Sequence, residues 1–135
     1  MFSQNTIHNS VIFFSISLAH KQEDFIRRVL SEDKFHDVWF LVEEERIGAS
    51  RLHMAASSDV FEKMLMGNFK EASQSEIIIK NADAKAFKLL IEYCYSFSTD
   101  FRSLSDSDLL ELLKLADRFQ TTVLFFGIHN YVLKD

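Results

Sequence analysis

The chain has 135 residues, of which 47% are apolar and 26% charged, a balance that fits one folded domain and excludes a disordered chain. Its net charge of −5 and its scattered Lys and Arg residues disfavour binding to nucleic acid. The single cysteine excludes an internal disulfide and fits a reducing compartment, the cytoplasm or the nucleus.

The first predicted element is the apolar run from Val11 to Ala19, which we interpret as a strand. This run is too short to cross a membrane, since a spanning helix needs about 20 residues. The leader from Met1 to Ser10 has no Lys or Arg, which disfavours a signal peptide, although a targeting segment stays an open alternative. We therefore expect an N-terminal segment at residues 1–19, no membrane contact, and one domain over residues 20–135.

An amphipathic helix is predicted from about His20 to Leu30, because apolar side chains recur on one face and charged ones lie opposite. The residues of the apolar face are Phe25, Ile26, Val29 and Leu30. Two strands follow, from Asp37 to Val42 and from Ile47 to Ser50, joined by a charged turn.

Two short helices and a third strand are predicted next. The first helix runs from Leu52 to Ser57, and Ser58 caps the second by accepting from its first-turn N–H groups. Gly67 is expected to end that helix in the left-handed conformation. A brief buried strand then runs from Ile77 to Lys80.

Three helices complete the chain. Asn81 or Asp83 caps the first, which carries the apolar Cys94, expected to be a buried core thiol. Ser105 and Asp108 resemble a capping box for the second helix, and the third starts at Thr121 or Thr122. The fourteen Phe residues predict a core built on aromatic packing in a small α/β domain, with roughly half of its residues helical.

Several of these segments together resemble the BTB/POZ domain family, whose hallmark is D-V-x-F, a turn, and A-H-R-x-x-L-A-x-x-S-x-x-F. The matching residues are Asp37, Val38, Phe40, Ala49, Arg51, Met54, Ala55, Ser58 and Phe61, with Ser50 standing where the family has His. Later motifs match at Tyr93 and Tyr95 and at Asp117, with Phe119 in place of Tyr. The resemblance implies a small three-stranded sheet flanked by about five to six helices.

The resemblance also implies homodimerisation, in which the helix that carries Phe25, Ile26, Val29 and Leu30 packs against its twin. An N-terminal strand from Val11 to Leu18 would cross to the partner's sheet. Asp37 and Arg51 match positions that line a charged pocket near the dimer axis, where a buried pair would favour specificity over stability. The alternatives are a stripe that packs within its own subunit and an isolated surface Arg51.

A second implication of the resemblance is recruitment of a cullin-3 ubiquitin ligase scaffold. Family members that do this carry a hydrophobic-x-Glu triplet before the third strand, and this chain has Phe69 and Glu71 there. An exposed aromatic anchor beside a carboxylate suits a binding hot spot. A plain loop, with Phe69 folded onto the core, is the alternative.

Catalytic and metal sites are not expected. None of the five His residues has metal-ligand spacing with Cys94, so we predict no metal and no cofactor. His53, Ser57 and Asp59 lie in one local segment, whereas triad members come from separate elements. The three glycines stand alone and form no phosphate loop, so we predict no enzyme.

The predicted function is that of a homodimeric protein–protein interaction module, the adaptor that links a substrate protein to a cullin-3 ubiquitin ligase. The alternative is a dimerisation module of a transcriptional repressor or another scaffold without ligase recruitment. Family adaptors carry a separate substrate-binding domain that this sequence does not contain. It is therefore a fragment, or a short member that forms mixed dimers with longer partners.

Overall fold

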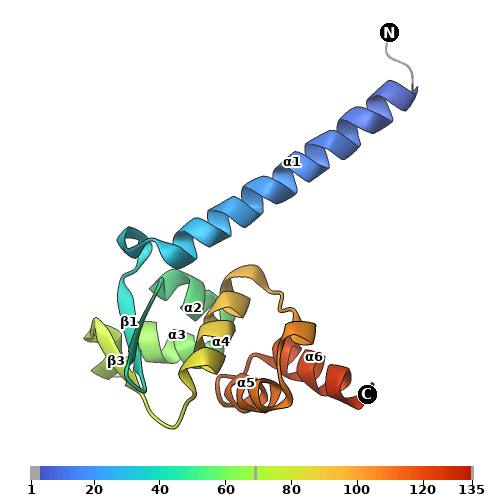
Figure 1. The fold of residues 1–135 in the computed structure, drawn as a ribbon. Coiled ribbons are helices and arrows are strands. Elements are labelled where there is room, and N and C mark those ends of the chain that lie inside the picture. The colour runs from blue at the N-terminus through green and yellow to red at the C-terminus, as the bar shows by residue number, and fades with distance from the viewer. Residues whose placement is uncertain (1–3, 69, 135) are drawn as a thin grey trace.

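The computed structural model describes residues 4–68 and 70–134. Strands and helices are interleaved up to residue 79, and only helices follow in the described residues (Figure 1). In chain order they are α1 (Gln4–Ser31), η1 (Asp33–Phe35), β1 (Val38–Val42), β2 (Glu45–Ala49), α2 (Arg51–Ser57), α3 (Asp59–Met66), η2 (Lys70–Ser73), β3 (Glu76–Ile79), α4 (Ala84–Ser96), η3 (Phe101–Ser103), α5 (Asp106–Arg118) and α6 (Thr122–Leu133), where η denotes a 3₁₀ helix.

The sheet has three strands in the order β2-β1-β3. β1 and β2 form an antiparallel hairpin, in which Phe40 lies opposite Ile47, and β1 pairs with β3 in parallel, with Phe40 beside Ile77. Alternate residues of the central strand β1 are fully buried, as expected for a strand that presents one face to the core. The predicted architecture of a three-stranded sheet with about five to six helices is confirmed.

The core between the sheet and the helices is built on phenylalanine rings, as the composition predicts. Phe61 of α3 stacks on Phe119 at the end of α5 with ring centroids 4.4 Å apart, and Phe87 of α4 meets Phe40 edge-on at 5.1 Å. All four rings are at most 1% exposed. Such aromatic pairs contribute about 0.5–1.5 kcal/mol beyond the area that they bury, so this cluster holds α3, α4 and α5 to the sheet.

The predicted helix caps are confirmed. Ser58 accepts from the Phe61 N–H at 3.2 Å, and Asp83 accepts from the Ala86 N–H at 2.9 Å. Ser105 and its third-position partner exchange both bonds of a capping box at the start of α5. Each cap satisfies first-turn N–H groups that have no partner within the helix.

The predicted strand from Val11 to Ala19 is wrong: these residues lie within α1, which runs without interruption from Gln4 to Ser31. The segment contains neither Gly nor Pro, so no residue stops the predicted His20–Leu30 helix from extending towards the N-terminus. A helix also closes its own backbone hydrogen bonds, whereas a strand here would need a sheet edge to pair with. The N-terminal half of α1 projects away from the domain (Figure 1).

Two glycines occupy positions at which a side chain would clash with neighbouring atoms. The predicted left-handed conformation of Gly67 is wrong, because its φ is −90°. A Cβ at Gly67 would lie 2.5 Å from the Lys63 carbonyl oxygen, and one at Gly48 would lie 2.3 Å from Nδ1 of His36. Close approach, and not φ, therefore requires glycine at both positions.

Among the described residues, no helix combines the length and the apolar character that a membrane-spanning segment requires.

Candidate functional site

A shallow apolar groove lies between α3 and η2. It has a volume of about 310 Å³ and is lined by Val60, Lys63, Met64 and Glu71. Of the predicted pair Phe69 and Glu71, Glu71 lies at this edge, and Phe69 lies outside the described residues. Glu71 is half-buried, so the structure places a carboxylate beside an apolar hollow that is open to the surface.

Arg51 fixes the chain that borders this groove. Its guanidinium donates to the Leu65 carbonyl at 2.9 Å, to the Ala72 carbonyl at 3.2 Å, and to the Gln74 carbonyl. These acceptors lie at the end of α3, within η2 and directly after η2. The planar guanidinium can donate in several directions at once, so one half-buried side chain holds the whole segment.

Asp37 and Arg51 are neighbours, but not as two facing charges. The Arg51 backbone N–H donates to the Asp37 carboxylate at 2.7 Å, while the Arg51 side chain turns away towards the three carbonyls. No ion pair between their side chains is found in the part of the chain that the structure describes. Asp37 is exposed and caps the start of α2, where a carboxylate is favourable.

Ser50, which stands where the related motif has His, has a complete set of local contacts. Its backbone N–H donates to the Tyr95 hydroxyl at 2.8 Å, and its hydroxyl lies 3.1 Å from Nδ1 of His53. The His53 ring in turn stacks on Tyr95 with centroids 4.6 Å apart. Burial raises the pKa of Tyr95, so this hydroxyl stays protonated and polar at neutral pH. The substitution therefore leaves the junction of β2 and α2 bonded to α4.

The predicted dimer face of α1 is divided between the core and the surface. Phe25 is 60% exposed, whereas Val29 is only 9% exposed and packs into the core of its own domain. Ile26 and Leu30 are partly buried against that core. Val29 therefore anchors the end of α1 to the domain, and Phe25 is the residue of this face most available to a neighbour.

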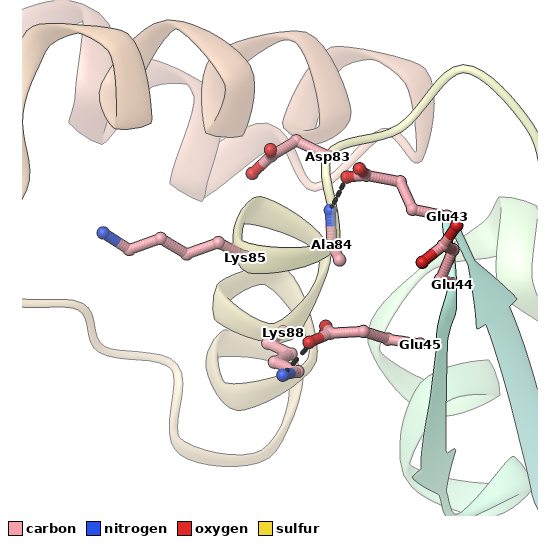
Figure 2. A pocket seen from close by; sticks show the side chains of 7 residues that line it. All are labelled: Glu43, Glu44, Glu45, Asp83, Ala84, Lys85 and Lys88. Carbon is pink, nitrogen blue, oxygen red and sulfur yellow. Dashed lines mark hydrogen bonds and ion pairs between the residues drawn. The ribbon is translucent and has the colours of Figure 1, made fainter.

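A second hollow is lined mostly by charged residues, whose bonds are structural (Figure 2). It has a volume of about 600 Å³ and lies between the β1–β2 turn and the start of α4. Glu43 accepts from the Ala84 N–H at 2.7 Å, and Glu45 pairs with Lys88 at 2.9 Å. These carboxylates hold the hairpin to α4. Within residues 4–68 and 70–134, no three His, Cys, Asp or Glu side chains are grouped as metal ligands.

The residues of the considered triad are occupied by structural contacts. The Ser57 hydroxyl donates to the Met54 carbonyl at 2.9 Å, and His53 is stacked on Tyr95. Asp59 is exposed in the first turn of α3, where a carboxylate complements the helix dipole. Among the described residues, the Ser57 hydroxyl makes no hydrogen bond to His53, whose Nδ1 lies beside the Ser50 hydroxyl instead.

Two groove residues, Val60 and Met64, were not predicted as site residues. In the structure Phe61 and Leu65 fill the core, whereas Val60 and Met64 are only partly buried and line the groove. All four residues lie on one apolar stripe of α3, and a stripe of this width is ordinary for a helix that packs against a core. Periodicity alone therefore does not separate the groove pair from the core pair.

Comparisons with known proteins identify the family. A family model described as "BTB/POZ domain" matches residues 26–134. The chain is 33% identical over 117 residues to BTB/POZ domain-containing protein 9 of Drosophila melanogaster, covering 87% of this chain and 16% of that protein. It is 30% identical over 112 residues to human Kelch-like protein 41, covering 83% of this chain and 18% of that protein. The chain thus spans less than a fifth of the length of these relatives.

Solved structures show the same fold. The BTB domain of zebrafish PATZ1 superposes with a TM-score of 0.70 at 18% identity, covering 90% of this chain and 95% of that one. The BTB domain of human gigaxonin superposes with a TM-score of 0.65, also at 18% identity, covering 80% of this chain and 87% of that one.

Proposed function

Because this chain belongs to the BTB/POZ domain family, we propose that it is a homodimeric interaction module that links a substrate protein to a cullin-3 ubiquitin ligase. The groove beside η2 carries this proposal. An apolar hollow with a carboxylate at its rim can accept a side chain of a partner helix and fix its register. Likeness to Kelch-like proteins supports the adaptor role.

The bonds of Arg51 support a preformed binding surface. Since Arg51 holds the carbonyls of Ala72 and Gln74, Glu71 lies on a segment tied down at its C-terminal side. A segment that is ordered before binding loses less conformational entropy when a partner docks. The Phe69 ring is proposed as the apolar anchor that accompanies Glu71.

The exposed part of the α1 face supports the proposed homodimer. Phe25 leaves most of an aromatic ring uncovered, and burying such a ring removes about 150–250 Å² from water. Ile26 and Leu30 flank it, and Val29 fixes the helix on which they lie. Asp37 and Arg51 are proposed to lie near the two-fold axis of this dimer. Asp37 would contribute its exposed carboxylate, and Arg51 would act through the chain segment that its side chain holds.

The cullin step is tested by isothermal titration calorimetry of the purified chain with the N-terminal domain of cullin-3. We expect Glu71→Ala and Met64→Asp each to weaken binding at least tenfold, about 1.4 kcal/mol or more. Glu44→Ala, an exposed glutamate on the β1–β2 turn, is the matched control and should bind like the wild type. Equal affinity of Glu71→Ala and Glu44→Ala removes the groove as the site. A wild type that dimerises without binding favours the alternative, a scaffold without ligase recruitment.

The dimer is tested by light scattering coupled to size exclusion. Phe25→Asp is expected to convert a twofold mass to a monomer mass with an unchanged circular-dichroism spectrum, because a carboxylate cannot be buried there unpaired. Phe97→Asp, at another exposed phenylalanine, is the control. A twofold mass for Phe25→Asp rejects this face.

A further inference from the structure

The N-terminal half of α1 projects away from the globular domain (Figure 1). Along its length, α1 exposes a row of large apolar side chains. The members of this row, with their exposed fractions, are Ile7 (53%), Val11 (58%), Phe14 (67%), Leu18 (48%) and Phe25 (60%). We call these residues the α1 seam. Soluble monomers rarely leave so continuous an apolar surface in water, so we expect a partner surface to cover the seam.

The spacing of the seam is that of a helix that pairs with another helix. Its first four members follow one another at intervals of four, three and four residues, and Lys21 and Phe25 continue the same alternation. Alternating steps of four and three keep apolar residues on one edge of an α-helix and define the two inward positions of a coiled coil. The exposed Phe13 and Ile16 lie off this edge.

The surface of α1 also has a hollow that can accept a side chain of a partner. This hollow is lined by Thr6, Ile7, Ser10, Val11 and Phe14. Four of these residues occupy the places that surround one inserted side chain in a parallel helix pair, and Val11 of a second copy is the side chain that would enter. The feature is self-complementary, since each helix supplies both the hollow and the side chain that fills it.

Between Ile7 and Leu18, the residues that flank the seam include no Asp, Glu, Lys or Arg. Ser10, Ser15 and Ser17 border it, and the first Asp, Glu, Lys or Arg of the chain is Lys21. Small neutral flanks let two copies approach without like-charge repulsion. A helix that lies on a membrane surface instead carries Lys and Arg along its polar face, which this segment does not. A second copy of the chain is therefore the favoured occupant.

We propose that the α1 seams of two copies pair in parallel, so that the dimer contact continues from Phe25 along the projecting helix to Ile7. This inference rests on the proposed homodimer and extends its interface. Parallel pairing follows because an antiparallel pair would separate the two domains and break the contact at Phe25. Phe14 and Phe25 are still mostly exposed, so the area that each has left to bury adds to the contact, for which a standard interface needs roughly 800 Å² per partner.

Two adjacent phenylalanines give a matched pair of variants. Phe14 is in the seam and Phe13 is off it, and they are 67% and 73% exposed. We expect Phe14→Asp to raise the dimer dissociation constant at least about tenfold in sedimentation equilibrium, and Phe13→Asp to change it less than about threefold. Since neither side chain is part of the core, both variants should keep the wild-type melting temperature. Equal constants for the two variants overturn the seam while leaving the domain dimer in place, whereas a monomeric wild type overturns both.

Cross-linking tests the parallel arrangement. The one native thiol, Cys94, is buried, so an introduced cysteine is the reactive one. Val11→Cys should form a disulfide-linked dimer under mild oxidation at least about ten times faster than Phe13→Cys, because only the seam brings equivalent residues face to face. Equal rates overturn the pairing. Binding of the wild type to phosphatidylcholine vesicles, lost equally in Phe13→Asp and Phe14→Asp, also overturns it in favour of a membrane contact.

Discussion

The hydroxyl of Ser58 donates to the carbonyl of Phe119 at 2.6 Å, which joins the start of α3 to the end of α5 across 61 positions of the chain. The same hydroxyl accepts from the Phe61 N–H at 3.2 Å, and the Phe61 and Phe119 rings stack beside it. Ser58 is only 4% exposed. One buried side chain is therefore both a helix cap and a tertiary bond.

Ser58→Ala is expected to lower the free energy of unfolding by about 1–3 kcal/mol, because it leaves a first-turn N–H and a buried carbonyl without their partner. Urea denaturation followed by circular dichroism measures this loss. Ser73→Ala is the control, since that exposed hydroxyl bonds only within η2 and should matter by less than about 0.5 kcal/mol. Equal stability of the two variants contradicts a structural role for the buried bond.

Arg51→Lys is expected to destabilise the domain by about 1–3 kcal/mol, because an ammonium cannot reach three carbonyls as the guanidinium does. Hydrogen exchange should become faster at Ala72 and Gln74 before it does so in β1. The control is Arg102→Lys, whose side chain is exposed and pairs only with the nearby Asp100. Unchanged exchange around η2 in Arg51→Lys argues against this side chain as the support of the groove.

Gln120→Gly is expected to raise the free energy of unfolding by about 0.5–1 kcal/mol, since Gln120 has a φ of 55° and glycine adopts that conformation without strain. The Thr121 N–H donates back to Ala116 at 2.9 Å, which completes the C-terminal motif of α5. Thermal melts of Gln120→Gly and Gln120→Val should shift in opposite directions, because a β-branched residue is strained at positive φ. A shift of both melting temperatures in the same direction would refute this account.

Burial raises the pKa of the Cys94 thiol from an ordinary value of 9.0 to about 11. Below pH 9 both the native and the unfolded chains keep the proton, and between pH 9 and 11 only the unfolded chain loses it. The free energy of unfolding should therefore fall in that window, with a contribution from Cys94 of up to about 1.4 kcal/mol per pH unit. Denaturation at pH 8 and at pH 10.5 measures the fall.

The control for the thiol is Cys94→Ala, in which the decline with pH should be shallower. Tyr93 and Tyr95 keep part of the decline in that variant, because burial raises the pKa of each of them as well. An identical pH dependence in the wild type and in Cys94→Ala would show that the thiol does not contribute.

Local patterns predicted most of the fold. Ser58 and Ser105 were identified as caps, and Asp83 as one of two alternatives with Asn81, from the residue type and its position before an apolar run; all three make a capping bond in the structure. These predictions succeeded because a cap depends on atoms only three residues away. The aromatic core followed from composition for a similar reason, since rings have few other places to be buried.

The candidate site was predictable only in part. The spacing of the motif placed Glu71 beside α3, but it did not single out Val60 and Met64 as groove residues, because periodicity does not indicate how wide a face the neighbouring elements cover. The charged pair at Asp37 and Arg51 was expected to form a pocket, whereas the Arg51 side chain turns to carbonyls from another part of the chain.

The sequence by itself determined the helix caps, the position of β1 and the membership of the BTB/POZ family, all of which depend on residue types at short or fixed spacing. Only the tertiary structure decided that Val60 and Met64 line a groove with Glu71, that Ser58 bonds to Phe119, and that Arg51 reaches Gln74. The physical reason is distance along the chain. Contacts of this kind depend on which distant segment of the chain lies opposite. The spacing of neighbouring residues does not encode which segment that is.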